Sequence, residues 1–323
     1  FDRLIQPLVG GIYTADPDRL SLRATLPRFI EMEQKYRSLI IGSRKQAAAR
    51  ETKSDADGSG ARYGLFTAPR GGMSVLFTRL VEAVSQNASV RFGERVVAVS
   101  SNKSGGYSVM LHSDEQLSFD GVVIALPSFQ AASILDAGQA DERVAHRSDS
   151  MDELIGHLNG IEYSSAAVVV SGHRLSDIRH PLDAFGLVIP AIENRKVLAI
   201  SFTSRKFPGR APDGRVLLRT FVGGAMQPEM LDQSDEGILE SVRSELHSIL
   251  GVGGDPDFME ICWHKRSMPQ YHVGHCDRVA RIRELVTDRA GLELAGNAYS
   301  GVGIPDCILS GESAAERLVE QLA

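Results

Sequence analysis

The stretch from Leu292 to Ala315 reads LELAGNAYSGVGIPDCILSGESAA and decides how the rest of the chain is interpreted. Leu292 to Ala295 predicts a short strand, because it is apolar apart from one residue and is bounded by a glycine. Gly296 ends this strand, and Gly301 and Gly303 follow at close spacing. Glycines of this kind allow the main chain to turn sharply and a ligand to approach it closely.

A helix is predicted to begin around Pro305, whose fixed φ suits a first helical turn. The apolar positions that recur at roughly helical spacing after it are Ile308, Ala315, Leu318, Val319 and Leu322. A strand, a glycine-rich turn and a helix N-terminus present backbone N–H groups without intrahelical partners. The pattern is compatible with a phosphate site, a flavin site or a tight strand-to-helix connection.

The run from Gly301 to Cys307, GVGIPDC, resembles the C-terminal flavin signature of oxygen-dependent protoporphyrinogen oxidases of the bacterial type. These enzymes belong to the flavin amine oxidase superfamily, in which the equivalent segment passes under the isoalloxazine ring. The resemblance implies FAD as the cofactor. On this stretch it implies flavin contacts at Gly296, Asn297, Tyr299, Gly301, Val302, Gly303 and Ile304.

Composition narrows the function classes. The chain has 323 residues, 43% hydrophobic and 24% charged, which suits a large core in two domains. A net charge of −6 argues against a nucleic-acid partner. The three cysteines have no metal-type spacing, and their odd number argues against a disulfide framework. No apolar run reaches transmembrane length.

The chain opens on Phe1 and contains no GxGxxG after a first strand. In the resembled family that fingerprint lies at the N-terminus and holds the FAD pyrophosphate. We therefore expect the chain to be the C-terminal two-thirds of a longer protein, with part of its cofactor site missing.

The first 127 residues are predicted to form two segments. Residues 1–62 are expected to be helical and on the substrate side, with a polar mobile loop at 43–62. Residues 63–127 are expected to belong to the FAD domain. Within them, a helix from Ser74 to Gln86 precedes the meander. The residues expected on the buried face of this helix are Leu76, Leu80, Val81 and Val84. The resemblance implies that the backbone of Val96 contacts the adenine.

Residues 128–283 are predicted to form a substrate-binding domain, and residues 284–323 to return to the FAD domain. Apolar strands are expected near 163–171, 185–190, 197–202 and 216–222, and short turns between them indicate antiparallel pairing. An amphipathic helix is expected from Ile238 to Leu250. The predicted fold class is α/β (α+β), with an incomplete Rossmann-like FAD/NAD(P)-binding domain and a substrate domain with a mixed or antiparallel sheet and flanking helices.

The predicted sheet carries further resemblance to the porphyrinogen oxidase substrate domain. The matching runs are Phe185 to Pro190, Phe207 to Pro212 and Phe221 to Gly224, which amine oxidases in general do not share. The resemblance implies an apolar pocket lined by Phe185, Val188 and Phe207. Taken singly, each of these three is favoured as an ordinary core residue.

Trp263, the one tryptophan, opens a run that resembles the family pattern Trp-x-x-x-x-Pro-Gln-Tyr-x-x-Gly-His. The shared spacing implies that Trp263 lies near the flavin. His272 and His275 suggest metal ligands, but no third ligand at useful spacing supports a metal site, and none is expected.

The first functional hypothesis is FAD-dependent oxidation of protoporphyrinogen IX to protoporphyrin IX in haem biosynthesis. It proceeds by hydride transfer from a methylene bridge to flavin N5, with O2 as acceptor. No side chain is assigned a catalytic role. A coproporphyrinogen III oxidase of the same family, another flavin amine oxidase relative and a non-catalytic remnant or folding partner are the alternatives. The expected location is cytoplasmic, and the resemblance leaves open peripheral membrane association, on the inner face of the cell membrane, and a homodimer.

Overall fold

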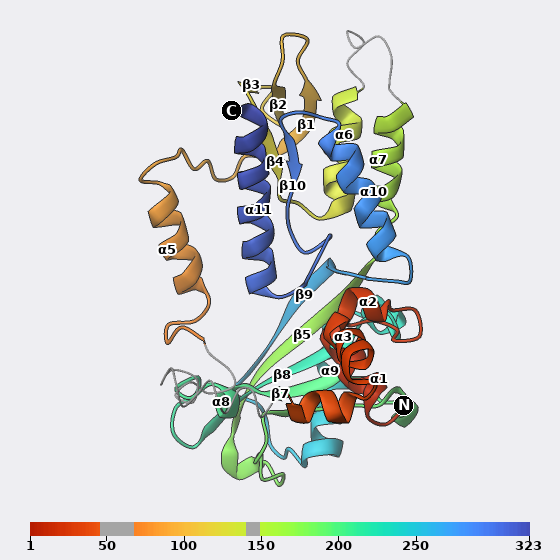
Figure 1. The fold of residues 1–323 in the computed structure, drawn as a ribbon. Coiled ribbons are helices and arrows are strands. Elements are labelled where there is room, and N and C mark those ends of the chain that lie inside the picture. The colour runs from red at the N-terminus through yellow and green to blue at the C-terminus, as the bar shows by residue number, and fades with distance from the viewer. Residues whose placement is uncertain (46–67, 140–148) are drawn as a thin grey trace, which may run out of the picture. The chain divides into compact units, whose positions relative to one another are not determined.

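The computed structural model describes residues 1–45, 68–139 and 149–323. Its contacts divide the chain into two compact units. We call residues 1–18, 27–90 and 164–268 the sheet unit, and residues 19–26, 91–163 and 269–323 the turn unit. Each unit is therefore assembled from segments that are far apart in the sequence (Figure 1).

The sheet unit is built on a five-stranded sheet in the order β6-β7-β8-β5-β9. Within it, β5 pairs with β8, β6 with β7, and β7 with β8, all antiparallel. The strands are β5 (Tyr163–Arg174), β6 (Gly186–Val188), β7 (Ala199–Phe202), β8 (Arg215–Gly223) and β9 (Phe258–Pro269). The helices are α1 (Ile5–Tyr13), α3 (Pro27–Tyr36), α5 (Ser74–Val84), α8 (Thr203–Lys206) and α9 (Asp235–Leu250), with short 3-10 turns η1 (Leu175–Asp177), η2 (Ala191–Glu193) and η3 (Pro228–Asp232).

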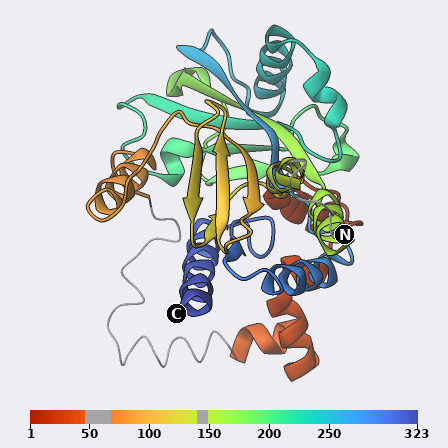
Figure 2. The same ribbon diagram turned by 90° about the horizontal axis from the view of Figure 1, so that it is seen from above.

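Helix α9 covers one face of this sheet and closes its core (Figure 2). The helix begins after Ser234, whose side chain accepts a hydrogen bond from the backbone N–H of Gly237, and ends at Gly251 in the left-handed region. The core residues of the sheet unit include Ala167, Val169, Ile200, Phe202, Leu218, Val222, Ile238, Val242, Leu246 and Leu250. Because side chains alternate along a strand, the intervening residues of β5, β7 and β8 lie on the opposite face.

The turn unit combines an antiparallel meander with a short parallel pair. The meander has the order β1-β2-β3, and β4 pairs in parallel with β10. The strands are β1 (Val96–Ser101), β2 (Tyr107–Leu111), β3 (Gln116–Phe119), β4 (Val122–Ile124) and β10 (Leu292–Leu294). The helices are α2 (Leu22–Thr25), α6 (Ser128–Gln139), α7 (Asp149–Asn159), α10 (His275–Thr287) and α11 (Ile304–Leu322).

The predicted domain boundaries differ from the boundaries of the two units. Residues 128–163 and 269–283 were expected in the substrate domain, but they belong to the turn unit. The reason is packing, since α6 lies against β1 and α7, and α7 lies against α10. Most of the loop expected at 43–62 lies outside the described residues, and residues 43–45 are helical.

The helix expected from Ser74 is present as α5, but its predicted buried face is exposed. Leu76, Leu80 and Val84 are exposed and Val81 is half-buried, because α5 makes no extensive contact with another described element. Among the described residues, no helix combines the length and apolar character needed to cross a bilayer.

Candidate cofactor-binding site

The glycine-rich turn connects β10 to α11, as the sequence predicts. β10 is fully buried beside β4, and the backbone N–H of Ala295 continues the ladder to the carbonyl of Ile124 at 3.1 Å. Gly296 follows with φ +118°, and its N–H donates to Ser310 Oγ of α11 at 3.0 Å. A Cβ at Gly296 would meet no atom within 4 Å, so the main chain presents a bare surface there.

Asp306 caps α11 and changes which ligand the turn can accept. Its Oδ2 accepts the backbone N–H of Gly303 at 3.3 Å, and its side chain packs against Gly301, which has φ +68°. A Cβ at Gly301 would lie 2.4 Å from the Asp306 side chain, so this glycine is required by the cap itself. Because this helix N-terminus already holds the negative charge of a carboxylate, a phosphate is disfavoured there and a flat, uncharged ligand surface fits better.

Two buried side chains hold the carbonyl groups of the turn. Tyr271 Oη donates to the carbonyl of Asn297 at 2.5 Å, and the imidazole of His275 hydrogen-bonds the backbone of Tyr299. The two rings stack with centroids 4.1 Å apart and an interplanar angle of 16°. Tyr271 is 1% exposed and His275 5% exposed. From the sequence, His275 was considered only as a metal ligand and Tyr271 was given no role, although the two residues are four positions apart.

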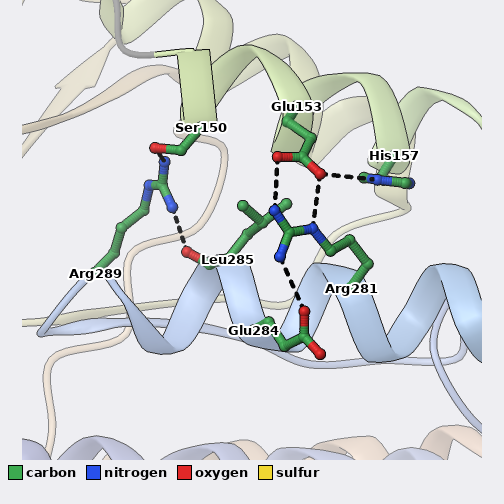
Figure 3. A network of polar contacts seen from close by, with 7 residues as sticks. All are labelled: Ser150, Glu153, His157, Arg281, Glu284, Leu285 and Arg289. Atoms are coloured by element: carbon green, nitrogen blue, oxygen red, sulfur yellow. Dashed lines mark hydrogen bonds and ion pairs between the residues drawn. The ribbon is translucent and has the colours of Figure 1, made fainter.

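An ion-pair network supports the helix that begins at His275. The guanidinium of Arg281 on α10 donates to both carboxylate oxygens of Glu153 on α7, at 2.7 and 2.8 Å (Figure 3). Arg281 lowers the pKa of Glu153, with its hydrogen bond as the first cause. Arg289 bridges Ser150 and the carbonyl of Leu285. The network fixes α10 on α7, and so fixes the start of the helix that carries His275.

The predicted flavin-contact residues of this turn lie together. Gly296, Asn297, Gly301, Val302 and Gly303 are half-buried, and Ile304 is exposed. Tyr299 differs, because its ring is buried in the core and its hydroxyl has no hydrogen-bond partner among the described residues. Tyr299 can therefore contact a ligand through its main chain, while burial raises the pKa of its hydroxyl.

A cavity of about 660 Å³ lies beside this turn and is bounded by Tyr299, Ser300 and Gly301. Its volume is in the range of small-molecule and cofactor sites. The rest of its lining comes from α10, β10 and α11, and the bare surface at Gly296 lies outside it. The half-buried main chain of the turn and the bare surface at Gly296 are the features that fit a flat ring. If a flavin is held here, Gly296, Asn297 and the segment from Ser300 to Ile304 are the residues that hold it.

Val96 lies elsewhere in the turn unit, at a second cavity of about 640 Å³. It begins β1 opposite Leu111, and the register shifts between Val96 and Ala98, so Val97 has no cross-strand partner. Such a bulge re-aims the neighbouring backbone. The walls of this cavity are mainly apolar and include Val99, Val122, Ile124, Leu126 and Ile134.

Trp263 belongs to the sheet unit. Its indole ring packs against the core under α9, and its Nε1–H donates to Asp235 Oδ1 at 3.1 Å. Lys265 Nζ lies 5.2 Å from the ring centroid. These contacts give Trp263 a structural role in the sheet unit, and the predicted flavin contact stays a prediction.

None of the three predicted pocket residues belongs to the core of the sheet unit. Phe185 is 51% exposed, Val188 is 38% exposed, and Phe207 is half-buried outside the core of the sheet unit. The registers place Val188 of β6, Ala199 of β7, Phe221 of β8 and Val168 of β5 side by side on the face opposite α9. We call these four residues the apolar row. Sequence reasoning missed Phe221 as a side chain of this face, although strand alternation from the core residues Leu218 and Val222 identifies it.

The turn unit thus carries a glycine-rich turn between a parallel strand and a helix N-terminus, and the comparisons with known proteins identify the class of protein. Residues 1–319 match the family described as flavin containing amine oxidoreductase, and the chain belongs to this family. The mixed α/β fold class and the flavin cofactor are therefore confirmed, as is the resemblance to this family.

Relatives and solved structures agree with the assignment. The chain is 33% identical over 315 residues to a coproporphyrinogen III oxidase of Bacillus subtilis (strain 168), covering 97% of this chain and 63% of the relative. It is 27% identical over 340 residues to protoporphyrinogen oxidase 2 of Arabidopsis thaliana, covering 99% and 64%. A solved structure from Exiguobacterium sp. 255-15, provisionally assigned as a protoporphyrinogen oxidase, has a TM-score of 0.78 at 28% identity, covering 99% and 64%.

The chain spans a little under two thirds of the length of the curated relatives it matches. The fold likeness extends to a cyclohexylamine oxidase from Brevibacterium oxydans IH-35A, with a TM-score of 0.63 at 16% identity, covering 99% of this chain and 64% of that one. Identity at that level supports the fold alone.

Proposed function

We propose that this protein oxidises a porphyrinogen, either protoporphyrinogen IX or coproporphyrinogen III, with a bound FAD. The observation that carries the proposal is the apolar row, which places the predicted pocket residue Val188 beside Ala199 and Phe221 on one face of a single sheet. Relatives named for both substrates support the class, and they match this chain along nearly its whole length.

The reaction does not require a pair of acid–base side chains. A porphyrinogen becomes an aromatic porphyrin by losing six electrons and six protons in three two-electron dehydrogenations. Bound flavin supplies the hydride acceptor for the sp³ methylene bridges. The chain must hold a flat macrocycle in one pose and keep water away from the reacting carbon. The ring of Phe221 and the aliphatic side chain of Val188 provide apolar contacts for holding such a macrocycle.

Dioxygen is the proposed terminal acceptor, taking two electrons and two protons per dehydrogenation to give hydrogen peroxide. We propose a cytoplasmic protein. The apolar substrate is a reason to test for attachment to the inner face of the cell membrane, by asking whether the protein sediments with membranes at low salt and is released at high salt.

The test is porphyrin fluorescence. Full-length, flavin-loaded protein is mixed with each porphyrinogen under air, and the appearance of the fluorescent porphyrin is followed. We expect Phe221→Ala to lower kcat/KM about tenfold or more, because truncating a buried or half-buried aromatic contact costs roughly 1 to 3 kcal/mol. The visible flavin absorbance should stay unchanged.

Phe119→Ala is the matched control, since Phe119 is an exposed phenylalanine of the turn unit. It should oxidise both porphyrinogens at the unmodified rate. Flavin-loaded protein that produces neither porphyrin would contradict the proposal, and so would full activity in Phe221→Ala.

A further inference from the structure

Arg219 of β8 lies on the same face of the sheet as the apolar row. It is exposed, and its guanidinium carbon is 5.3 Å from the ring centroid of Phe221, the next residue on that face. Strand alternation requires this placement, because Leu218 and Val222 point into the core under α9. A positive charge therefore borders an apolar surface that is suited to a macrocycle.

The neighbours of Arg219 across the strands are small or apolar. The registers pair it with Ser201 of β7 and Val170 of β5, and Ser201 in turn with Gly186 of β6. Gly186 can carry no side chain, because a Cβ there would lie 2.5 Å from the carbonyl oxygen of Ile200. In this row the strands beside Arg219 therefore present only a serine, a valine and a glycine.

No carboxylate of the described residues forms an ion pair with Arg219. In a chain whose net charge is −6, an arginine without an acidic neighbour is a site for an external anion. Its planar fork is well suited to a carboxylate, which it can bind through two parallel hydrogen bonds.

A second cation lies close to it. Lys206 ends α8, the short helix that packs against β8, and its Nζ lies 5.6 Å from the ring centroid of Phe207. The pKa of Lys206 is lowered, first by burial and then by the positive charge of Arg219. The two like charges therefore repel each other, and a carboxylate bound between them would offset this repulsion.

We propose that Arg219 and Lys206 bind a carboxylate of the substrate at the border of the apolar row. This inference rests on the proposed function and adds a determinant of substrate choice. Coproporphyrinogen III carries four propionates around its ring, whereas protoporphyrinogen IX carries two propionates and two vinyl groups. A cation pair at this position favours the tetracarboxylate, because it contacts a propionate where the other substrate presents a neutral vinyl.

The experiment compares substrates in one set of variants. Full-length, flavin-loaded protein and its Arg219→Gln, Arg219→Lys and Lys206→Gln variants are assayed with coproporphyrinogen III, with its tetramethyl ester and with protoporphyrinogen IX. We expect Arg219→Gln to lower kcat/KM for coproporphyrinogen III about 10- to 100-fold, mainly through KM, because a charge-assisted hydrogen-bond pair is lost. Lys206→Gln should lower it less, and Arg219→Lys should recover part of it.

The neutral ester and the control variant separate recognition from misfolding. The ester should react equally with the unmodified protein and with Arg219→Gln, and protoporphyrinogen IX should lose less than coproporphyrinogen III. Arg243→Gln, an exposed arginine of α9 on the other side of the sheet, should change none of these rates.

The outcomes distinguish this inference from the proposed function. If the unmodified protein oxidises none of the three compounds, the proposed function fails. If it oxidises them but Arg219→Gln leaves the coproporphyrinogen rate unchanged, or lowers the ester rate equally, carboxylate recognition by Arg219 is overturned.

Discussion

His275 is the residue at which the protonation of one side chain bears directly on the turn. Burial lowers the pKa of its imidazole to about 4, against a smaller opposing effect of its hydrogen bond to the Tyr299 backbone. Between that value and the pKa of about 6.5 expected in the unfolded chain, the unfolded state binds a proton that the folded state does not. The free energy of unfolding must therefore fall as the pH drops through this window.

The prediction is a loss of at most about 3 kcal/mol in the free energy of unfolding as the pH falls from 7 to 4. His275→Phe keeps a ring to stack on Tyr271 but cannot titrate, so its stability should vary less between pH 6.5 and 4.5. Urea unfolding at a series of pH values measures both curves. His112→Gln, at an exposed histidine, should behave like the unmodified protein. Parallel curves for His275→Phe and the unmodified protein would refute this role.

Individual residues also show how far the sequence could define the site. The glycines of the turn were predictable, because strand, glycine and proline signals coincide within a few residues. The cap at Asp306 was not predicted, although an acid two residues inside a helix start is a known signal. The hydrogen bond from Tyr271 to Asn297 joins positions 26 residues apart, and no local pattern predicts such a contact.

At the scale of elements, a buried carboxylate joins the strand before the turn to the helix after it. Glu293 of β10 has a side chain only 5% exposed, and it accepts hydrogen bonds from Arg317 Nη2 at 2.9 Å and Gln321 Nε2 at 3.0 Å. Both partners lie on α11. The contact fixes α11 against β10, and so fixes the geometry of the turn between them.

Arg317→Ala should therefore destabilise the protein by about 2 kcal/mol, less than for a fully buried pair because Arg317 is half exposed. The buried carboxylate would lose most of its compensation. Thermal unfolding and hydrogen exchange of the α11 amides are the measurements, with Arg243→Ala as the control. Unchanged exchange in α11 would show that Glu293 does not hold this helix.

The elements most accurately predicted were those with strong periodicity or continuous apolar runs. The meander and the strands β5 to β8 were expected near their observed positions, and the antiparallel pairing is confirmed. β9 was not predicted as a strand, because half of its residues are exposed and its centre is polar. α5 was predicted from its period, but periodicity alone cannot reveal whether a partner covers the apolar face.

At the scale of the whole molecule, the interleaving of the two units was beyond sequence reasoning. The predicted domains were contiguous segments, whereas each observed unit draws on three stretches of the chain. Local patterns determine elements, but the choice of which helix packs on which sheet depends on long-range contacts. The segment 128–163 is an example, since α6 packs on β1 and α7 packs on α10.

The central claim is that a flavin ring lies along the main chain from Gly296 to Gly303, and Gly303→Val tests it most directly. Gly303 has φ −77° and ψ 154°, a conformation that any residue adopts, and an added Cβ would lie 3.0 Å from Asp306 Oδ2, at the end of a side chain, and 3.6 Å from Pro305 Cδ, an ordinary contact. The fold should therefore tolerate this substitution. Gly311→Val is the control, because a Cβ at Gly311 meets no atom within 4 Å.

The measurement is the visible flavin absorbance per protein of the two purified, full-length variants. As the control for folding, the thermal unfolding midpoints of the two flavin-free variants should match. We predict that Gly303→Val loses most of its bound flavin, while Gly311→Val stays as yellow as the unmodified protein. A Gly303→Val protein that retains stoichiometric flavin would contradict the account.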